Sequence, residues 1–117
     1  MDYLEEVDIP SAKERFMGNE ALYKKFLFRL PENTLMAELE QHLAENNLED
    51  AFKDAHTMKG MFGNLSLNKL MNASSKLTET LRAKQFPEES ELEELRNAYK
   101  AALNAVNEII KQDIKLF

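Results

Sequence analysis

The sequence predicts an all-α protein, an antiparallel up-down-up-down four-helix bundle with a short extra N-terminal helix. Three observations lead to this fold. Apolar residues recur at spacings of three and four along most of the chain, which is the period of an amphipathic helix. No segment alternates apolar and polar residues as a half-exposed strand does. Only three glycines and three prolines are present, so the connections between helices are expected to be short.

Breaker residues set the expected helix boundaries in the first half of the chain. Pro10 marks the first turn of a short helix that ends at Gly18. Asn19 is expected to cap the next helix, whose apolar stripe runs on to about residue 45. Pro31 interrupts or kinks this second helix, because proline removes a backbone donor and clashes with the preceding turn.

The second half of the chain contains three further amphipathic segments. One runs from about Leu48 to Asn64, and the next begins at residues 66–68 and ends near Lys84. The last starts at Pro87, and the glutamates that follow it lie at the positive end of the helix dipole. Together with the interrupted helix before them, these segments supply the four helices of the bundle.

Length and composition limit the classes of protein that the chain can represent. Its 117 residues form one domain, 1–117, which is large enough for a core without covalent staples. Cysteine is absent, which excludes disulfides and cysteine-ligated metals. The acidic start is no signal peptide and no apolar run approaches the roughly 20 residues of a membrane span, so a cytoplasmic location is expected. The net charge of −6 argues against nucleic-acid binding.

His56 stands apart from the apolar stripe of the segment 48–64. At about 100° per residue, Gly60 and Gly63 fall on the same side of the helix as His56, and Lys59 lies between them and the core edge. Glycine inside a helix costs roughly 0.5–1 kcal/mol relative to alanine. The two glycines therefore favour access to an exposed imidazole. The alternatives are a surface histidine without a role and glycines that allow close helix packing.

The residues around His56 narrow the chemistry that it could perform. A metal site is disfavoured because no second histidine or carboxylate lies four residues away on that face. No serine or cysteine nucleophile pairs with it, and His42, in a polar run, is interpreted as solvated. A neutral imidazole can itself be the nucleophile and take a phosphoryl group. Lys59 would balance the phosphoryl charge, and Mg²⁺ would come from a partner because the site has no carboxylate cluster.

Several stretches of the sequence are similar to one known family. The segment AHTMKG at 55–60 resembles the A-H-x-L-K-G core of histidine-containing phosphotransfer (HPt) domains, the modules of bacterial multistep phosphorelays. The similarity continues through NLSL at 64–67, and AKERFMGNE at 12–20 resembles the family's opening motif. The departures are Met17 and Ser66, where glycine is usual, and Thr78, where glutamate or glutamine is common.

The resemblance implies roles for individual residues. His56 would be the phospho-acceptor, Lys59 the stabilising cation and Gly60 the residue that gives the partner room. The expected partners are response-regulator receiver domains and an upstream hybrid sensor histidine kinase. The chain would be a phosphoryl carrier with no kinase activity and no cofactor of its own. The predicted docking patch around His56 consists of Phe52, Lys53, Lys59, Gly60, Gly63 and Asn64.

Some alternatives stay open at this stage. Phe52 could equally belong to the core, and Lys53 could be an ordinary solvated charge. A start at Met1 without a nucleotide-binding loop favours a free-standing relay protein, but an HPt domain excised from a larger hybrid or chemotaxis-type kinase would look similar. A four-helix adaptor that binds a receiver domain without phosphotransfer is the third reading. The sequence identifies neither the kinase, the receiver, the direction of flow nor the oligomeric state.

Overall fold

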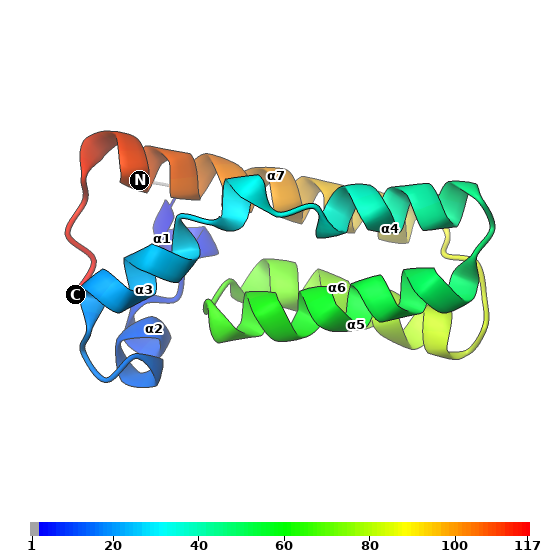
Figure 1. The fold of residues 1–117 in the computed structure, drawn as a ribbon, viewed down its shortest axis with the longest axis horizontal. Helices are drawn as coiled ribbons and strands as arrows, with labels where there is room; N and C mark the ends of the chain where they lie inside the picture. The colour runs from blue at the N-terminus through cyan, green and yellow to red at the C-terminus, as the bar shows by residue number, and fades with distance from the viewer. Residues whose placement is uncertain (1–2) are drawn as a thin grey trace.

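Four helices run back and forth along the long axis of the molecule (Figure 1). They are α4 (Leu35–Ala44), α5 (Leu48–Asn64), α6 (Asn68–Arg82) and α7 (Glu89–Gln112). The computed structural model describes residues 3–117, and residues 1–2 of the predicted domain 1–117 lie outside the described part. Within residues 3–117 there is no strand, and α5 packs between α4 and α6 while α6 also packs on α7. The predicted all-α bundle is confirmed.

Three short helices, α1 (Tyr3–Glu6), α2 (Ile9–Arg15) and α3 (Glu20–Leu27), precede the bundle. In Figure 1, α2 and α3 lie at the end of the molecule where α5 finishes, and α1 packs against α7 and α6. The sequence predicts only one short helix before Asn19, so α1 is an addition. The predicted break at Pro31 is present as the 3₁₀ turn η1 (Leu30–Glu32), which separates α3 from α4 completely.

Side-chain caps fix where the helices begin. The Asn19 carboxamide oxygen accepts a hydrogen bond from the Leu22 amide at 3.1 Å, and that of Asn47 accepts one from the Asp50 amide at 3.1 Å. Each such cap contributes about 1 kcal/mol to helix stability. Because Asn47 fixes the start of α5, the helix has the predicted limits and His56 lies in its middle turns.

Two of the departures from the family motif occupy a strained backbone conformation. Met17 has φ 53° and Ser66 has φ 59°, in the left-handed region, which costs a residue other than glycine roughly 1–2 kcal/mol. Met17 is 92% exposed and has no packing that offsets this cost. Ser66 is fully buried, donates a hydrogen bond to the Ser11 hydroxyl at 3.0 Å and accepts one from the Asp8 amide at 2.9 Å. These contacts hold the α5–α6 turn with serine in place of the usual glycine.

Tyr23 ties α3 to the end of the helix that carries His56. Its fully buried hydroxyl donates a hydrogen bond of 2.6 Å to the Leu65 carbonyl, directly after the last residue of α5. Burial raises the pKa of Tyr23, so the hydroxyl stays a donor over the physiological pH range. The ring packs edge-on against Phe16, at 5.1 Å between centroids, and stacks on Phe117 at 5.6 Å.

Tyr23→Phe is expected to lower the free energy of unfolding by about 1–3 kcal/mol, because it leaves the buried Leu65 carbonyl without a partner. Urea denaturation of the variant and the wild type would measure the difference. Tyr99→Phe is a matched control with a smaller expected cost. Its half-buried hydroxyl accepts from the Asn33 carboxamide, which also donates to the Leu30 carbonyl. Equal stability of Tyr23→Phe and wild type would contradict the prediction.

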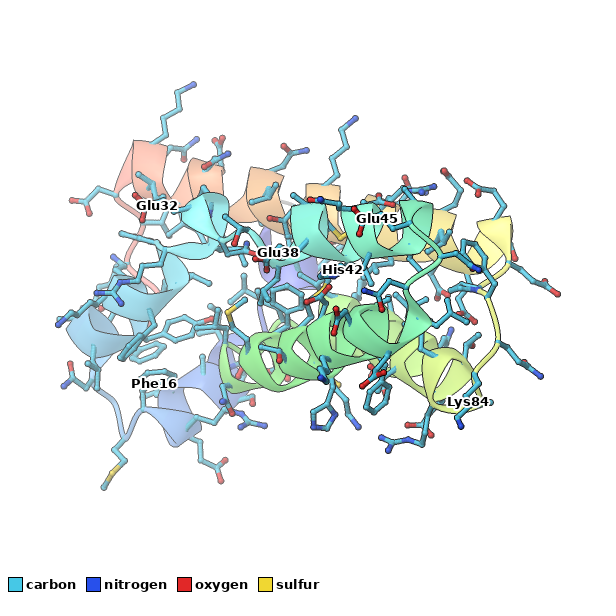
Figure 2. All side chains as sticks on the ribbon, turned by 45° about the vertical axis from the view of Figure 1, so that its right-hand side comes forward. Phe16, Glu32, Glu38, His42, Glu45 and Lys84 are labelled. Carbon is cyan, nitrogen blue, oxygen red and sulfur yellow. The ribbon has the colours of Figure 1, made fainter. Side chains whose placement is uncertain are left out.

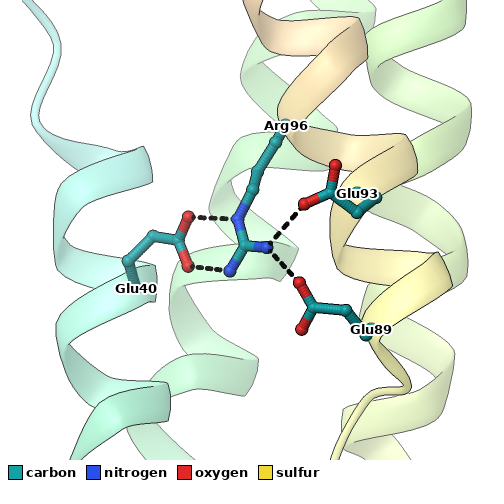
Figure 3. Close-up of polar contacts among 4 residues, drawn as sticks. All are labelled: Glu40, Glu89, Glu93 and Arg96. Carbon is teal, nitrogen blue, oxygen red and sulfur yellow. Dashed lines mark hydrogen bonds and ion pairs between the residues drawn. The ribbon is translucent and has the colours of Figure 1, made fainter.

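An ion-pair cluster joins α4 to α7 (Figure 3). Arg96 of α7 holds both carboxylate oxygens of Glu40 on α4, at 2.8 and 2.9 Å. Its third nitrogen reaches Glu89 at 2.8 Å and Glu93 at 3.2 Å. These side chains are partly exposed, so we assign the cluster only about 1 kcal/mol. The cluster therefore joins two helices of the bundle, α4 and α7, neither of which carries His56.

Candidate functional site

His56 projects from the outer face of α5. The residue is exposed, whereas Ala55 and Met58 beside it in the sequence are fully buried. The described part of the chain, residues 3–117, gives the imidazole no hydrogen bond. Its ring nitrogens are therefore open to solvent or to a docked partner.

Phe52 stacks on the imidazole of His56, and Arg82 contacts the Phe52 ring. The Phe52 and His56 rings lie 5.9 Å apart between centroids, with an angle of 20° between their planes. The guanidinium carbon of Arg82, on α6, lies 5.0 Å from the centroid of the Phe52 ring. Arg82 also forms an ion pair with Glu79 at 3.3 Å. Phe52 is half-buried and packs on the core as well. It thus belongs to both the core and the surface around His56, and its ring faces one side of the imidazole.

The two lysines of the predicted site lie in different environments. Lys59, one turn after His56, is half-buried and forms no ion pair with any residue between 3 and 117. Lys53 is exposed and lies 3.9 Å from carboxylate oxygens of both Glu49 and Asp50. Two nearby carboxylates offset the charge of Lys53, so Lys59 is the cation more available to an incoming phosphoryl group.

The two glycines of α5 differ in what surrounds them. A Cβ at Gly60 would meet no atom within 4 Å, so Gly60 leaves open space one turn from His56. A Cβ at Gly63 would lie 3.3 Å from Cγ of Met71 on α6, so Gly63 allows α6 to approach closely. The packing alternative therefore applies to Gly63, while Gly60 fits the access interpretation. Asn64, the last residue of the predicted docking patch, is exposed at the end of α5.

Thr78 does not supply a partner for the imidazole. It is fully buried in α6, and its hydroxyl donates a hydrogen bond of 2.7 Å to the Ser74 carbonyl. With threonine in place of the usual glutamate or glutamine, this position therefore makes no hydrogen bond to His56. The aromatic ring that contacts the imidazole is that of Phe52, which belongs to α5 itself.

His42 is not the solvated residue that the sequence predicts. It is half-buried, and its Nδ1 lies 2.5 Å from a carboxylate oxygen of Asp54, so it connects α4 to α5. Figure 2 shows His42 on α4, and Asp54 lies two residues before His56 on α5. The hydrogen bond to Asp54 raises the pKa of His42; burial opposes this, and the charges of Asp54, Asp50 and Glu45 raise the pKa further.

The His42–Asp54 pair is expected to make stability depend on pH. A raised pKa in the folded state means that the contribution is fully present below the unfolded value of about 6.5 and is lost as pH rises through the folded value. The stability difference between wild type and His42→Gln should therefore be larger near pH 5.5 than near pH 8.5, as measured by urea denaturation. Asp54→Asn should remove the same pH dependence. An equal difference at both pH values would contradict this assignment.

The fold and this surface define a four-helix bundle with one exposed histidine on a central helix. A protein-family model described as Hpt domain matches residues 22–108, which is more than half of the chain. The chain therefore belongs to the Hpt domain family, and the resemblance in its motifs is confirmed. No curated protein and no solved structure matches it.

The family fixes the general activity. Hpt domains carry out histidine phosphotransfer in phosphorelays, generally act as phosphocarriers without kinase activity, and interact with response regulators and kinases of two-component systems. Over residues 3–117, no helix is long and apolar enough to cross a membrane. In the same range, no three histidine or carboxylate side chains are grouped so that they could hold a metal ion. The individual roles of the site residues stay predictions.

Proposed function

We propose that this chain accepts a phosphoryl group on His56 and exchanges it with the aspartate of a response-regulator receiver domain. One observation carries the proposal: in an Hpt-family chain, the imidazole of His56 stands exposed on a central helix, with open space left by Gly60 one turn away. The proposal includes an upstream hybrid sensor histidine kinase and a cytoplasmic location. It also includes Mg²⁺ that is supplied by the receiver domain.

The chemistry follows from the lack of a hydrogen-bond partner for the imidazole among residues 3–117. A neutral ring nitrogen of His56 attacks the phosphorus of the receiver's aspartyl phosphate; the new N–P bond forms as the P–O bond to the aspartate breaks. The aspartate leaves as a carboxylate, and the proton on the phosphorylated ring passes to solvent. Phe52 holds one face of the imidazole, which reduces the orientations that the nucleophile samples. The reverse reaction uses the same contacts.

Lys59→Ala is expected to slow phosphotransfer by about tenfold to a hundredfold, because a charge-assisted contact to the phosphoryl oxygens is worth roughly 1.5–3 kcal/mol. Single-turnover transfer from a phosphorylated receiver domain would measure the rate, and circular dichroism would verify the fold. Lys53→Ala is the comparison on the same helix and should slow transfer less than Lys59→Ala, since Glu49 and Asp50 already offset the charge of Lys53. An unchanged rate in Lys59→Ala would remove its assigned role.

The experiment that tests the function is transfer from a phosphorylated receiver domain in the presence of Mg²⁺. Intact mass and acid stability of this chain are followed with time. We expect a single added phosphoryl group that is labile in acid and stable in base, as a phosphoramidate linkage is. Phosphoramidate, a small phosphoryl donor, is tested in parallel because it needs no docking. Failure with both donors would favour the adaptor that binds a receiver without phosphotransfer.

A further inference from the structure

A groove of about 780 Å³ opens where α2 and α3 meet the end of α5. Phe16 and Glu32, which both line it, lie at the same end of the molecule in Figure 2. The residues that give the groove its chemistry come from three helices and the segment after α3; they are Arg15, Phe16, Phe26, Arg29, Glu32, Met61 and Asn64. None of them except Asn64 belongs to the predicted docking patch.

The groove has an aromatic floor that is anchored to the core. The Phe16 and Phe26 rings lie 6.2 Å apart between centroids, and Phe16 packs on the fully buried Tyr23. Phe26 is 42% exposed. Because the buried Tyr23 fixes the position of Phe16, the exposed aromatic surface is already formed before binding. Such a surface can bind an apolar side chain of a partner.

Two arginines flank this floor without carboxylate partners. The Arg29 guanidinium carbon lies 5.9 Å from the centroid of Phe26, and Arg15 donates only a long hydrogen bond of 3.4 Å to Ser11. Neither forms an ion pair with a residue of the described range 3–117. The other two arginines of the chain, Arg82 and Arg96, are both paired with glutamates. Glu32 is the one acidic residue of the groove lining, so two arginines against one glutamate leave the groove positive in a chain of net charge −6. The arginine pair is therefore suited to a carboxylate that stands next to an apolar side chain.

The groove lies within reach of a protein docked over His56. Asn64 lines the groove and follows His56 by eight residues, which is about 12 Å along the helix axis. A standard protein interface buries about 800 Å² on each partner, which corresponds to a disc of about 16 Å radius. Asn64 is also turned by about 80° around the helix axis from His56, so a partner centred on His56 reaches Asn64 near the edge of its footprint, where the groove begins.

We propose that this groove, which we call the Arg15–Arg29 groove, docks an acidic and apolar surface segment of the receiver domain and helps to select it. The inference rests on the proposed phosphotransfer function, and it adds a second contact region and the chemistry of the segment bound there. Arg15 and Arg29 pair with carboxylates, while Phe16 and Phe26 receive the apolar side chain between them.

A charge-reversal experiment tests this inference. The double variant Arg15→Glu/Arg29→Glu is compared with Lys13→Glu/Lys25→Glu, which makes the same charge change with exposed lysines of α2 and α3 that do not line the groove. Phosphorylation of His56 is measured with phosphoramidate and with a panel of receiver domains phosphorylated by acetyl phosphate. For the receiver that transfers fastest, the concentration at half-maximal rate should rise at least about tenfold in the arginine variant and less than about threefold in the lysine variant.

The two donors separate failure of this inference from failure of the function. Phosphoramidate should modify both variants at the wild-type rate, because it needs no docking surface. An unchanged half-maximal receiver concentration in the arginine variant, or an equal rise in both variants, would overturn the groove proposal. So would modification by phosphoramidate without transfer from any receiver, or a wild-type dimer that only the arginine variant disrupts, since the occupant would then be a second copy. Absence of modification by phosphoramidate would instead contradict the function of His56.

Discussion

His56→Gln is expected to abolish phosphorylation of this chain, both by a phosphorylated receiver domain and by phosphoramidate. Glutamine keeps a polar side chain at the same exposed position but has no nucleophilic nitrogen. The fold should persist because His56 forms no hydrogen bond within residues 3–117 and is not part of the core. Intact-mass measurement should show one added phosphoryl group on the wild type and none on the variant.

His42→Gln is the matched control, since the chain contains only two histidines. Its Nδ1 is held by Asp54 between α4 and α5, so its loss should reduce stability at low pH without stopping transfer. Persistent modification of His56→Gln would place the acceptor elsewhere. In cells, the adaptor hypothesis predicts that His56→Gln keeps its function, and a loss of signalling would exclude that hypothesis.

The fold was predictable where short-range physics determines it. Asn19 caps the helix that the sequence assigns to it, and α5 has the predicted limits, with Asn47 as its cap. The 3.6-residue period also predicts the outward position of His56, since the apolar stripe of α5 is buried as expected. What the sequence leaves undecided at Pro31 is the degree of interruption: the 3₁₀ turn breaks the chain into two separate helices.

The surroundings of the site depend on contacts between helices, which local patterns do not contain. His42 lies in a polar run, and only the packing of α4 on α5 brings Asp54 to it. Gly60 and Gly63 share a side of α5, but Met71 of α6 approaches only Gly63. The Phe52–His56 stack could have been inferred from the spacing of four residues. The Arg82 contact to the same ring could not, because it comes from another helix.

The sequence alone does not predict the Arg15–Arg29 groove, because its residues come together only through packing between helices. Its walls come from α2, α3 and α5, and the unpaired state of its arginines follows only from the positions of all described carboxylates. Selection of one receiver among several similar ones requires contacts that differ between relay proteins. Arg15 and Phe16 belong to the opening motif, so Phe26, Arg29 and Met61, which lie outside the motifs, are the groove residues that can supply such contacts.

Gly60→Leu is expected to reduce transfer from a receiver domain by about a hundredfold or more while the variant remains folded. Open space surrounds the position in the isolated chain, so the new side chain fits there, and replacing glycine in a helix should raise stability by about 0.5–1 kcal/mol. The same side chain would stand one turn from the imidazole, where the partner's aspartyl phosphate must approach. A displacement of the reacting atoms by about 1 Å is enough for a loss of this size.

The two donors and a smaller substitution make this prediction specific. Phosphoramidate should modify Gly60→Leu at close to the wild-type rate, because a small donor can reach the ring past a single side chain. Gly60→Ala should gain most of the stability and lose less of the receiver transfer, since its methyl group extends less far from the helix. If Gly60→Leu exchanges phosphate with the receiver normally, the glycine does not serve access. Its presence would then have no explanation in packing either, because no atom lies within 4 Å of the missing Cβ.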